Sequence, residues 1–216
     1  MLDPAVRTLI VVGASAGGRA AVGSVVKDLS ADIPAAIIVM MHVAPESQFD
    51  LAAWFRQFGH IKILQASHNE RVREGVVFLP PSGHAVTVHD HHLSVEALGR
   101  TIRPHQTITD LFSSAAKCCG ERTIGVILSG SLSDGSKGLR AVHDAGGLTV
   151  IQSDAQYGDM PASALAQVPN TTFHLHATDI GLTLDLLARR NAGLETGLAS
   201  AVRGLNDRIA PPHPPG

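Results

Sequence analysis

Short, wholly apolar runs alternate along this chain with segments of helical periodicity, and this alternation limits the possible folds more than any other feature. Several runs carry no polar residue on either face, which is typical of strands buried on both sides in a parallel sheet. The sequence therefore predicts an α/β fold with a doubly wound, mostly parallel sheet flanked by helices. The expected strands are residues 9–12, 36–41, 61–65, 76–79, 124–128, 148–152 and 172–174. The expected helices are residues 18–29, 49–58, 109–119, 134–145, 160–167 and 178–191.

Residues 84–96 break this pattern and predict an antiparallel hairpin at an edge of the main sheet. Apolar and polar residues alternate there on both sides of a polar turn, Asp90-His91-His92. His89, His91 and His92 have a spacing that could hold a metal, but a solvated turn is the commoner origin of such a group. We therefore expect no metal site and no cofactor.

Composition limits the remaining functional classes. With 216 residues, of which 44% are apolar, the chain can form one good core. Its net charge of −2 argues against a nucleic-acid partner, and no apolar run approaches the roughly 18 residues of a membrane span. The N-terminus lacks the layout of an export signal, so we expect a cytoplasmic protein without membrane insertion. Cys118 and Cys119 are adjacent on an expected helix and are predicted to be ordinary reduced thiols.

One turn carries the first chemical signal. The first apolar run leads into Gly13-Ala14-Ser15-Ala16-Gly17-Gly18, where small residues on both sides of Ser15 leave its hydroxyl exposed before a helix. Backbone N–H groups and the positive end of the helix dipole then face any negative charge beside it. Such a turn can mount a nucleophile or hold a phosphate.

The phosphate-binding alternatives lack their accompanying residues. A dinucleotide site requires G-x-G-x-x-G and an acid about 20 residues later, whereas the glycines here have another spacing and the second run ends in Met40-Met41-His42. A P-loop requires Gly-Lys-Ser/Thr where this chain has Gly18-Arg19-Ala20. The only tyrosine, Tyr157, is not followed by the lysine of a short-chain dehydrogenase.

Three polar side chains are expected at one rim of the sheet. Ser15 follows the first strand, His42 the second, and Asp134 the strand over residues 124–128. A serine nucleophile requires a base, and the base requires a carboxylate that fixes its tautomer. The order serine, histidine, aspartate differs from that of the α/β-hydrolases, in which the acid precedes the histidine.

Motifs around these residues carry a resemblance that extends from residue 7 to about residue 190. They are Val12-Gly-Ala-Ser-Ala-Gly-Gly18, His42-Val-Ala-Pro45, Leu79-Pro-Pro81, Arg103-Pro104 with Asp110-Leu-Phe112, Gly125-Val-Ile-Leu-Ser-Gly130 with Asp134-Gly135, and Met160-Pro161. In this order they resemble the catalytic domain of the chemotaxis protein-glutamate methylesterases.

The resemblance implies a serine hydrolase that demethylates glutamate methyl esters on the cytoplasmic helices of chemoreceptors, with deamidation of receptor glutamines as a second activity. It assigns Ser15 as nucleophile, His42 as general base and Asp134 as the residue that orients the histidine. The backbone N–H groups of Ser131 and Ala16 would form the oxyanion hole. The resemblance also places Gly17, Gly18, Leu132, Arg103 and Met160 near the substrate. His84 and His105 lie in expected loops near the same site.

The chain departs from the family pattern at several points. Ala16 stands where a hydroxyl residue is common, and Ser131-Leu132 replaces a Met and a Gly. The chain also begins almost directly at the first strand, without the receiver domain that is typical of these enzymes. We therefore expect a catalytic domain over residues 1–195 and a helix end with a Pro-rich disordered tail over residues 196–216. Control would then come from a partner such as a separate response regulator or signalling protein, from expression, or not at all. Two alternatives stay open, namely a receptor-binding module whose catalysis has decayed and a serine esterase acting on a non-receptor substrate.

Overall fold

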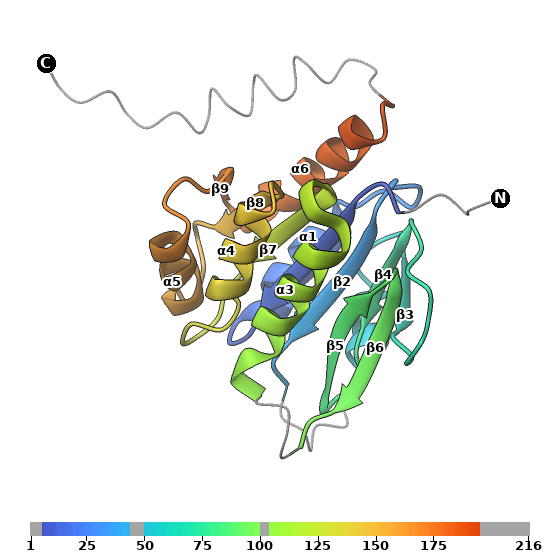
Figure 1. The fold of residues 1–216 in the computed structure, drawn as a ribbon, viewed down its shortest axis with the longest axis horizontal. Helices are drawn as coiled ribbons and strands as arrows, with labels where there is room; N and C mark the ends of the chain where they lie inside the picture. Colours follow the sequence, from blue (N-terminus) through green and yellow to red (C-terminus); the bar gives the residue numbers. More distant parts are fainter. Residues whose placement is uncertain (1–5, 44–49, 100–103, 195–216) are drawn as a thin grey trace, which may run out of the picture.

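The computed structural model describes residues 6–43, 50–99 and 104–194, and its main element is a seven-stranded sheet (Figure 1). All neighbouring strands are parallel, in the order β3-β4-β2-β1-β7-β8-β9. The strands are β1 (Leu9–Ala14), β2 (Ala36–Met41), β3 (Lys62–Gln65), β4 (Val76–Leu79), β7 (Thr123–Ile127), β8 (Leu148–Gln152) and β9 (Phe173–Leu175). The predicted parallel α/β sheet is confirmed.

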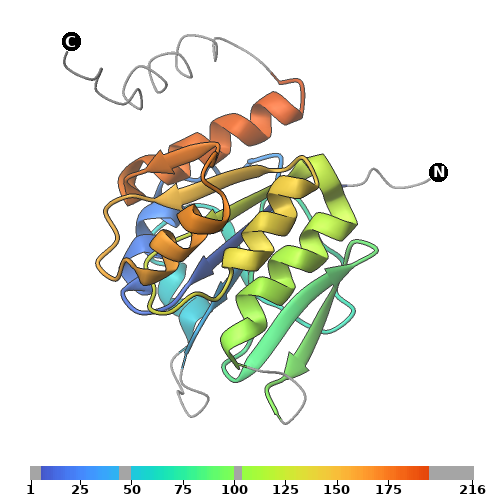
Figure 2. The same cartoon turned by 60° about the vertical axis from the view of Figure 1, so that its left-hand side comes forward.

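Helices cover both faces of this sheet, and each face has its own apolar core (Figures 1 and 2). Successive strand residues point to opposite faces, so Ile10 and Val12 of β1 pack in one core and Leu9 and Val11 in the other. The first core includes residues of α1 (Gly18–Lys27), α2 (Leu51–Phe55) and α6 (Ala177–Asn191). The second includes residues of α3 (Thr107–Cys119), α4 (Ser136–Asp144) and α5 (Asp159–Gln167).

The carboxyl ends of the three central strands are in register. Ala14 of β1 pairs with Met41 of β2, and Gly13 pairs with Ile127 of β7. The segments that follow these strands therefore leave the sheet at the same edge, which is where parallel α/β sheets bind ligands. The register of β1, β2 and β7 therefore brings the residues that follow these three strands close together in space.

The predicted hairpin exists, but it is not an edge of the main sheet. β5 (His84–His89) and β6 (His92–Ala97) form a separate two-stranded sheet that lies beside α3 (Figure 1). Val86, Val88 and Leu93 fill the second core together with residues of α3, so burial of these side chains holds the hairpin there. The turn is also shorter than expected, because His92 pairs with His89 and only Asp90 and His91 connect the strands. Both have positive φ, 47° and 62°, as a two-residue type I′ turn requires.

Three other expectations on boundaries are corrected. β1 continues through Gly13 and Ala14, because pairing with both neighbouring strands holds this segment extended. α4 begins at Ser136 and not at Asp134, after Gly135 adopts a left-handed conformation with φ 87°. α3 begins at Thr107, two residues earlier than predicted, and is preceded by a 3₁₀ turn over Pro104–Gln106.

The proposed division at residue 195 stays a prediction, since the predicted tail over residues 196–216 lies outside the described residues. Within the described part of the chain, every helix is too short or too polar to cross a bilayer.

Candidate active site

Ser15 lies in the turn between β1 and α1, and this turn is fixed against the end of β7. The Ser15 N–H donates to the Ser129 carbonyl (2.9 Å), and the Gly18 N–H donates to the Ser15 carbonyl (2.9 Å). Gly17 has φ 71°, and a Cβ there would lie only 2.7 Å from Ser129 Oγ. A side chain at position 17 would therefore be strained by its backbone and would also crowd Ser129. The predicted position of Ser15, at a strand end before a helix, agrees with the structure.

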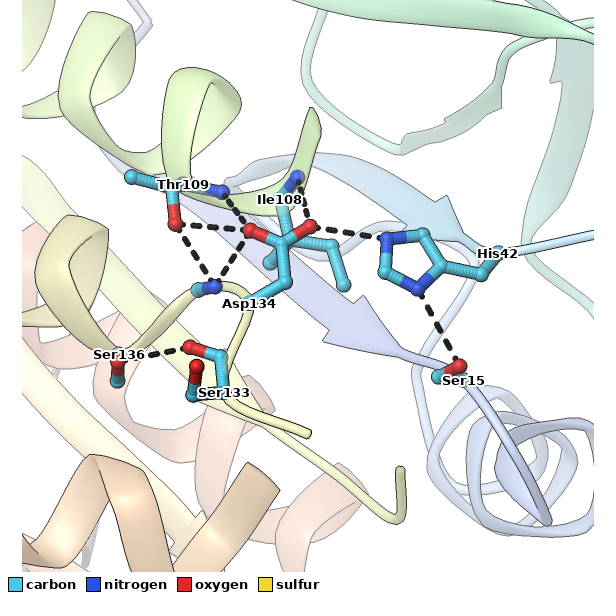
Figure 3. A network of polar contacts seen from close by, with 8 residues as sticks. Ser15, His42, Ile108, Thr109, Ser133, Asp134 and Ser136 are labelled. Atoms are coloured by element: carbon cyan, nitrogen blue, oxygen red, sulfur yellow. Dashed lines mark hydrogen bonds and ion pairs between the residues drawn. The ribbon is translucent and has the colours of Figure 1, made fainter. Parts of the chain in front are cut away.

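His42 places its imidazole ring between Ser15 and Asp134 (Figure 3). Its Nδ1 lies 3.2 Å from Ser15 Oγ, and its Nε2 lies 2.9 Å from Asp134 Oδ2. The His42 N–H donates to the Ala14 carbonyl (3.1 Å), which ties the residue to the end of β1. With Asp134 ionised, Nε2 carries the proton and Nδ1 presents a lone pair to the serine hydroxyl. In chymotrypsin-like proteases Nε2 faces the serine and Nδ1 faces the aspartate. Here the two nitrogens are exchanged, but one still faces the serine hydroxyl and the other the carboxylate.

Asp134 is buried and accepts hydrogen bonds on both carboxylate oxygens. Besides His42, Oδ2 accepts from the Ile108 N–H (3.0 Å), and Oδ1 accepts from the Thr109 N–H (3.0 Å), the Thr109 hydroxyl (2.8 Å) and the Gly135 N–H (2.7 Å). Burial alone would raise the pKa of Asp134, but the hydrogen bonds from His42, Thr109 and Ile108 outweigh it and lower the pKa below its ordinary value. The carboxylate is therefore ionised at neutral pH, a charge state compatible with its predicted orienting role.

This carboxylate also caps α3 from a distant loop. The N–H groups of Ile108 and Thr109 belong to the first turn of α3, where no intrahelical acceptor exists. A negative charge at this end interacts favourably with the helix dipole. Asp134 precedes α4 in the chain, yet it caps the start of α3, and α4 itself has no side-chain cap.

Two supporting residues were not predicted from the sequence. Thr109 holds Asp134 through its hydroxyl and also accepts the Gly135 N–H (2.9 Å). Ser129 donates its hydroxyl to the Ala16 carbonyl (2.8 Å) and accepts the Tyr157 N–H (3.0 Å), so it joins the turn after β1 to the segment before α5. The only sequence signals are that Thr109 directly precedes the motif Asp110-Leu-Phe112 and that Ser129 lies within the motif of residues 125–130.

Backbone N–H groups without an acceptor in the described part of the chain lie at the hollows beside Ser15. Among the described residues, the N–H groups of Ala16 and Ser131 donate to no acceptor, and both residues line hollows that include Ser15. The turn at Ser131-Leu132 has an unusual backbone, because Leu132 adopts φ 67° and is 63% exposed. A glycine would adopt this conformation without strain.

Two hollows meet at Ser15 and His42. The first, of about 310 Å³, lies between the strand ends and the 79–84 segment, and Leu132, His84 and His105 are among its lining residues. The second is an open groove of about 1040 Å³ along α1 and α2, whose lining includes Arg19, Lys27, Trp54 and Phe58. Gly17 and Gly18 line this groove, and their place near a substrate stays a prediction.

Of the other expected substrate neighbours, Met160 does not line either hollow. Met160 is fully buried and packs directly beneath Gly130, so it supports the turn and does not face a ligand. Arg103 lies outside the described residues. His105 instead stands edge-to-face with the His42 ring, with their centroids 6.3 Å apart.

Comparisons with known proteins agree with one another. Residues 10–184 match the family model of the CheB methylesterase. The chain is 36% identical over 183 residues to protein-glutamate methylesterase/protein-glutamine glutaminase 2 of Anaeromyxobacter dehalogenans. This alignment covers 84% of this chain and 51% of that protein. It is 30% identical to a putative protein-glutamate methylesterase/protein-glutamine glutaminase of Leptospira interrogans, covering 83% of this chain and 90% of that protein.

A solved structure has the same fold. The catalytic domain of the Thermotoga maritima CheB methylesterase superimposes with a TM-score of 0.73 at 24% identity, over 83% of this chain and 98% of that domain. The chain spans about half the length of the Anaeromyxobacter relative and of a Moorella thermoacetica relative that is 29% identical.

Proposed function

Because the chain belongs to the CheB methylesterase family, we propose that it hydrolyses glutamate methyl esters with Ser15 as the nucleophile. The proposed substrates are the cytoplasmic helices of methylated chemoreceptors, which the protein would meet in the cytoplasm. Deamidation of receptor glutamines is the proposed second activity, since an amide carbonyl presents the same electrophilic carbon. One observation carries the proposal, namely the His42 ring held between the Ser15 hydroxyl and the Asp134 carboxylate.

The proposed reaction begins when Ser15 Oγ attacks the ester carbonyl carbon and His42 Nδ1 takes the hydroxyl proton. The negative charge on the carbonyl oxygen is stabilised by the N–H groups of Ala16 and Ser131. The tetrahedral intermediate then collapses, and the bond to the methoxy oxygen breaks. His42 gives its proton to this oxygen, and methanol leaves an acyl group on Ser15.

Water completes the cycle. His42 removes a proton from a water molecule, whose oxygen attacks the acyl carbon, and the same proton returns to Ser15 Oγ as the ester bond breaks. The products are the glutamate carboxylate and free enzyme. Asp134 stays ionised throughout and stabilises the imidazolium that forms twice per turnover.

The methyl group offers little area for binding, so affinity must come from the surrounding protein surface. The groove along α1 and α2 suits an acidic helical segment, because Arg19 and Lys27 supply positive charge and Trp54 and Phe58 supply apolar area. We place the receptor helix in this groove, with the ester directed toward Ser15.

The test measures methanol release from a methylated chemoreceptor cytoplasmic fragment by the wild type, Ser15→Ala and Ser133→Ala. Ser133 is an exposed serine of the turn before Asp134, and its contacts are made by its backbone carbonyl. Release by the wild type and Ser133→Ala, with a loss of several orders of magnitude in Ser15→Ala, supports the proposal. Binding without release identifies a decayed receptor-binding module. Turnover that survives in Ser15→Ala refutes the nucleophile assignment.

A further inference from the structure

The far end of α3 carries a group of soft ligand atoms that the hydrolytic site does not use. Cys118 and Cys119 are the last two residues of this helix, and His91 lies in the turn of the β5–β6 hairpin. Cys118 Sγ is 3.9 Å from His91 Nδ1, and the ligand atoms of all three residues lie within 4.8 Å of one another. Cys119 is buried, whereas Cys118 and His91 are half-buried, so the group is reachable from solvent on one side.

The backbone of the hairpin directs one of its histidines toward the two thiols. His91 has φ 62°, and its carbonyl accepts the Val72 N–H (2.9 Å), which fixes the turn. The Val88 N–H donates to Ser114 Oγ (3.1 Å) and so attaches β5 to α3 one turn before the cysteines. The neighbouring histidines make other contacts, because His89 bonds Thr87 Oγ1 (3.1 Å) and His92 bonds the Asp90 carbonyl (2.9 Å).

We propose that His91, Cys118 and Cys119 form a zinc-binding site that joins the hairpin to α3. Two thiolates and one imidazole are the ligands that Zn²⁺ prefers, and three protein ligands leave a fourth tetrahedral position for water. Binding releases two protons, one from each thiol, and uses the lone pair of His91 Nδ1. The carbonyl end of α3 also favours a cation at this place.

The proposed zinc site lies apart from the hydrolytic site. α3 has 13 residues, so its two ends lie roughly 20 Å apart at 1.5 Å per residue. Asp134 binds the first turn of this helix and the cysteines occupy the last. Zinc would therefore stabilise the hairpin and α3 without contacting the ester.

The experiment titrates the reduced full chain with Co²⁺ and then with Zn²⁺. Thiolate coordination of Co²⁺ gives a charge-transfer absorption in the near ultraviolet and tetrahedral visible bands, which Zn²⁺ abolishes on displacement. The variants are Cys118→Ser, His91→Asn and His92→Asn. Asparagine tolerates the left-handed conformation of position 91, so His91→Asn removes the ligand without straining the turn. His92→Asn is the matched control, because it alters the adjacent histidine.

We expect one Co²⁺ per chain with thiolate bands in the wild type and in His92→Asn. Zinc affinity should fall at least about tenfold to 100-fold in Cys118→Ser and His91→Asn. Zinc should also raise the melting temperature of the wild type and of His92→Asn, and much less that of the other two variants. The absence of thiolate bands in the wild type would overturn the proposal. Equal loss of affinity in His91→Asn and His92→Asn, or no loss in His91→Asn, would overturn it as well.

Discussion

Replacing Asp134 by asparagine tests the proposed chemistry most directly, because five donors from the described part of the chain surround this carboxylate. An amide has one oxygen and one NH₂ group. The NH₂ group must therefore occupy the position of either Oδ1 or Oδ2, where it lies against hydrogen-bond donors and cannot accept from them. With NH₂ at the Oδ1 position, it meets the N–H groups of Thr109 and Gly135 and the Thr109 hydroxyl. With NH₂ at the Oδ2 position, it meets the Ile108 N–H and His42 Nε2. The second orientation disturbs fewer donors, and we expect it to prevail.

In that orientation His42 can relieve the conflict by moving its proton from Nε2 to Nδ1. Nδ1 then faces Ser15 with an N–H and cannot accept the hydroxyl proton. Loss of the correct tautomer costs about 10⁴-fold in rate, or about 5.4 kcal/mol at 1.36 kcal/mol per factor of ten. The buried Ile108 N–H also loses its acceptor, which should reduce stability by about 1–3 kcal/mol.

The assay compares kcat/KM for methanol release by the wild type, Asp134→Asn and Asp110→Asn, each shown to be folded by its urea unfolding curve. Asp110 is the matched control, because it lies on α3 within electrostatic reach of Asp134. Its pKa is raised first by burial and then by the charge of Asp134. We expect Asp110→Asn to keep its activity within about twofold. Folded Asp134→Asn with more than about one hundredth of wild-type kcat/KM would refute the tautomer argument. An equal loss in Asp110→Asn would show that local charge, and not the bond to His42, matters.

Two further predictions follow from the same region. In Gly130→Ala the new Cβ overlaps Met160 Sδ and comes within 3.0 Å of Ser15 Cβ, so we expect a loss of about 1–3 kcal/mol in stability together with reduced esterase activity. Melting curves of Gly130→Ala, of Met160→Ala, of the double variant and of Gly158→Ala check this, since a Cβ at Gly158 meets nothing within 4 Å. Met160 is fully buried, so Met160→Ala is itself destabilising; a double variant whose loss equals the sum of the two single losses would contradict the overlap. Burial opposes the ionised form of Asp134, but hydrogen bonds lower its pKa below the ordinary 3.8. The ionised carboxylate therefore contributes its full stabilisation above pH 3.8, and this contribution is lost as the pH falls through the folded-state pKa. The urea midpoint of the wild type should therefore fall more steeply than that of Asp134→Asn as the pH drops below about 4, and parallel curves would contradict the assignment.

Elements with a simple local cause were predictable. The limits of β2, β4 and β8 agree with the prediction, because each is an uninterrupted apolar run with clear boundaries. The end of β1 was missed because glycine and alanine have low strand propensity, and only pairing with Met41 and Ile127 reveals the strand. The hairpin was recognised from its alternation, but its location depends on side chains that pack against α3.

Some residues of the candidate site were also predictable from the sequence, and others were not. Ser15, His42 and Asp134 were found because each follows a strand, and the structure brings them together; their catalytic roles stay predictions. Thr109 could not be found, since its bond to Asp134 spans 25 positions between separate segments. Met160 was placed beside the substrate because of its motif, whereas its burial depends on the close approach of Gly130.

The position of β1 in the sheet has a consequence for the order in which the protein is made. Leu9 pairs with Ala36 on one side and with Thr123 on the other. A nascent chain that has emerged through β4 can already bring Ser15 beside His42, but Asp134 has not yet been synthesised. The pairing of β1 with β7 closes the longest loop between neighbouring strands of the main sheet, so we expect β7 to pair with β1 late in folding. Esterase activity would then appear only after β7 has paired with β1, so the recovery of activity during refolding would report when the centre of the sheet forms.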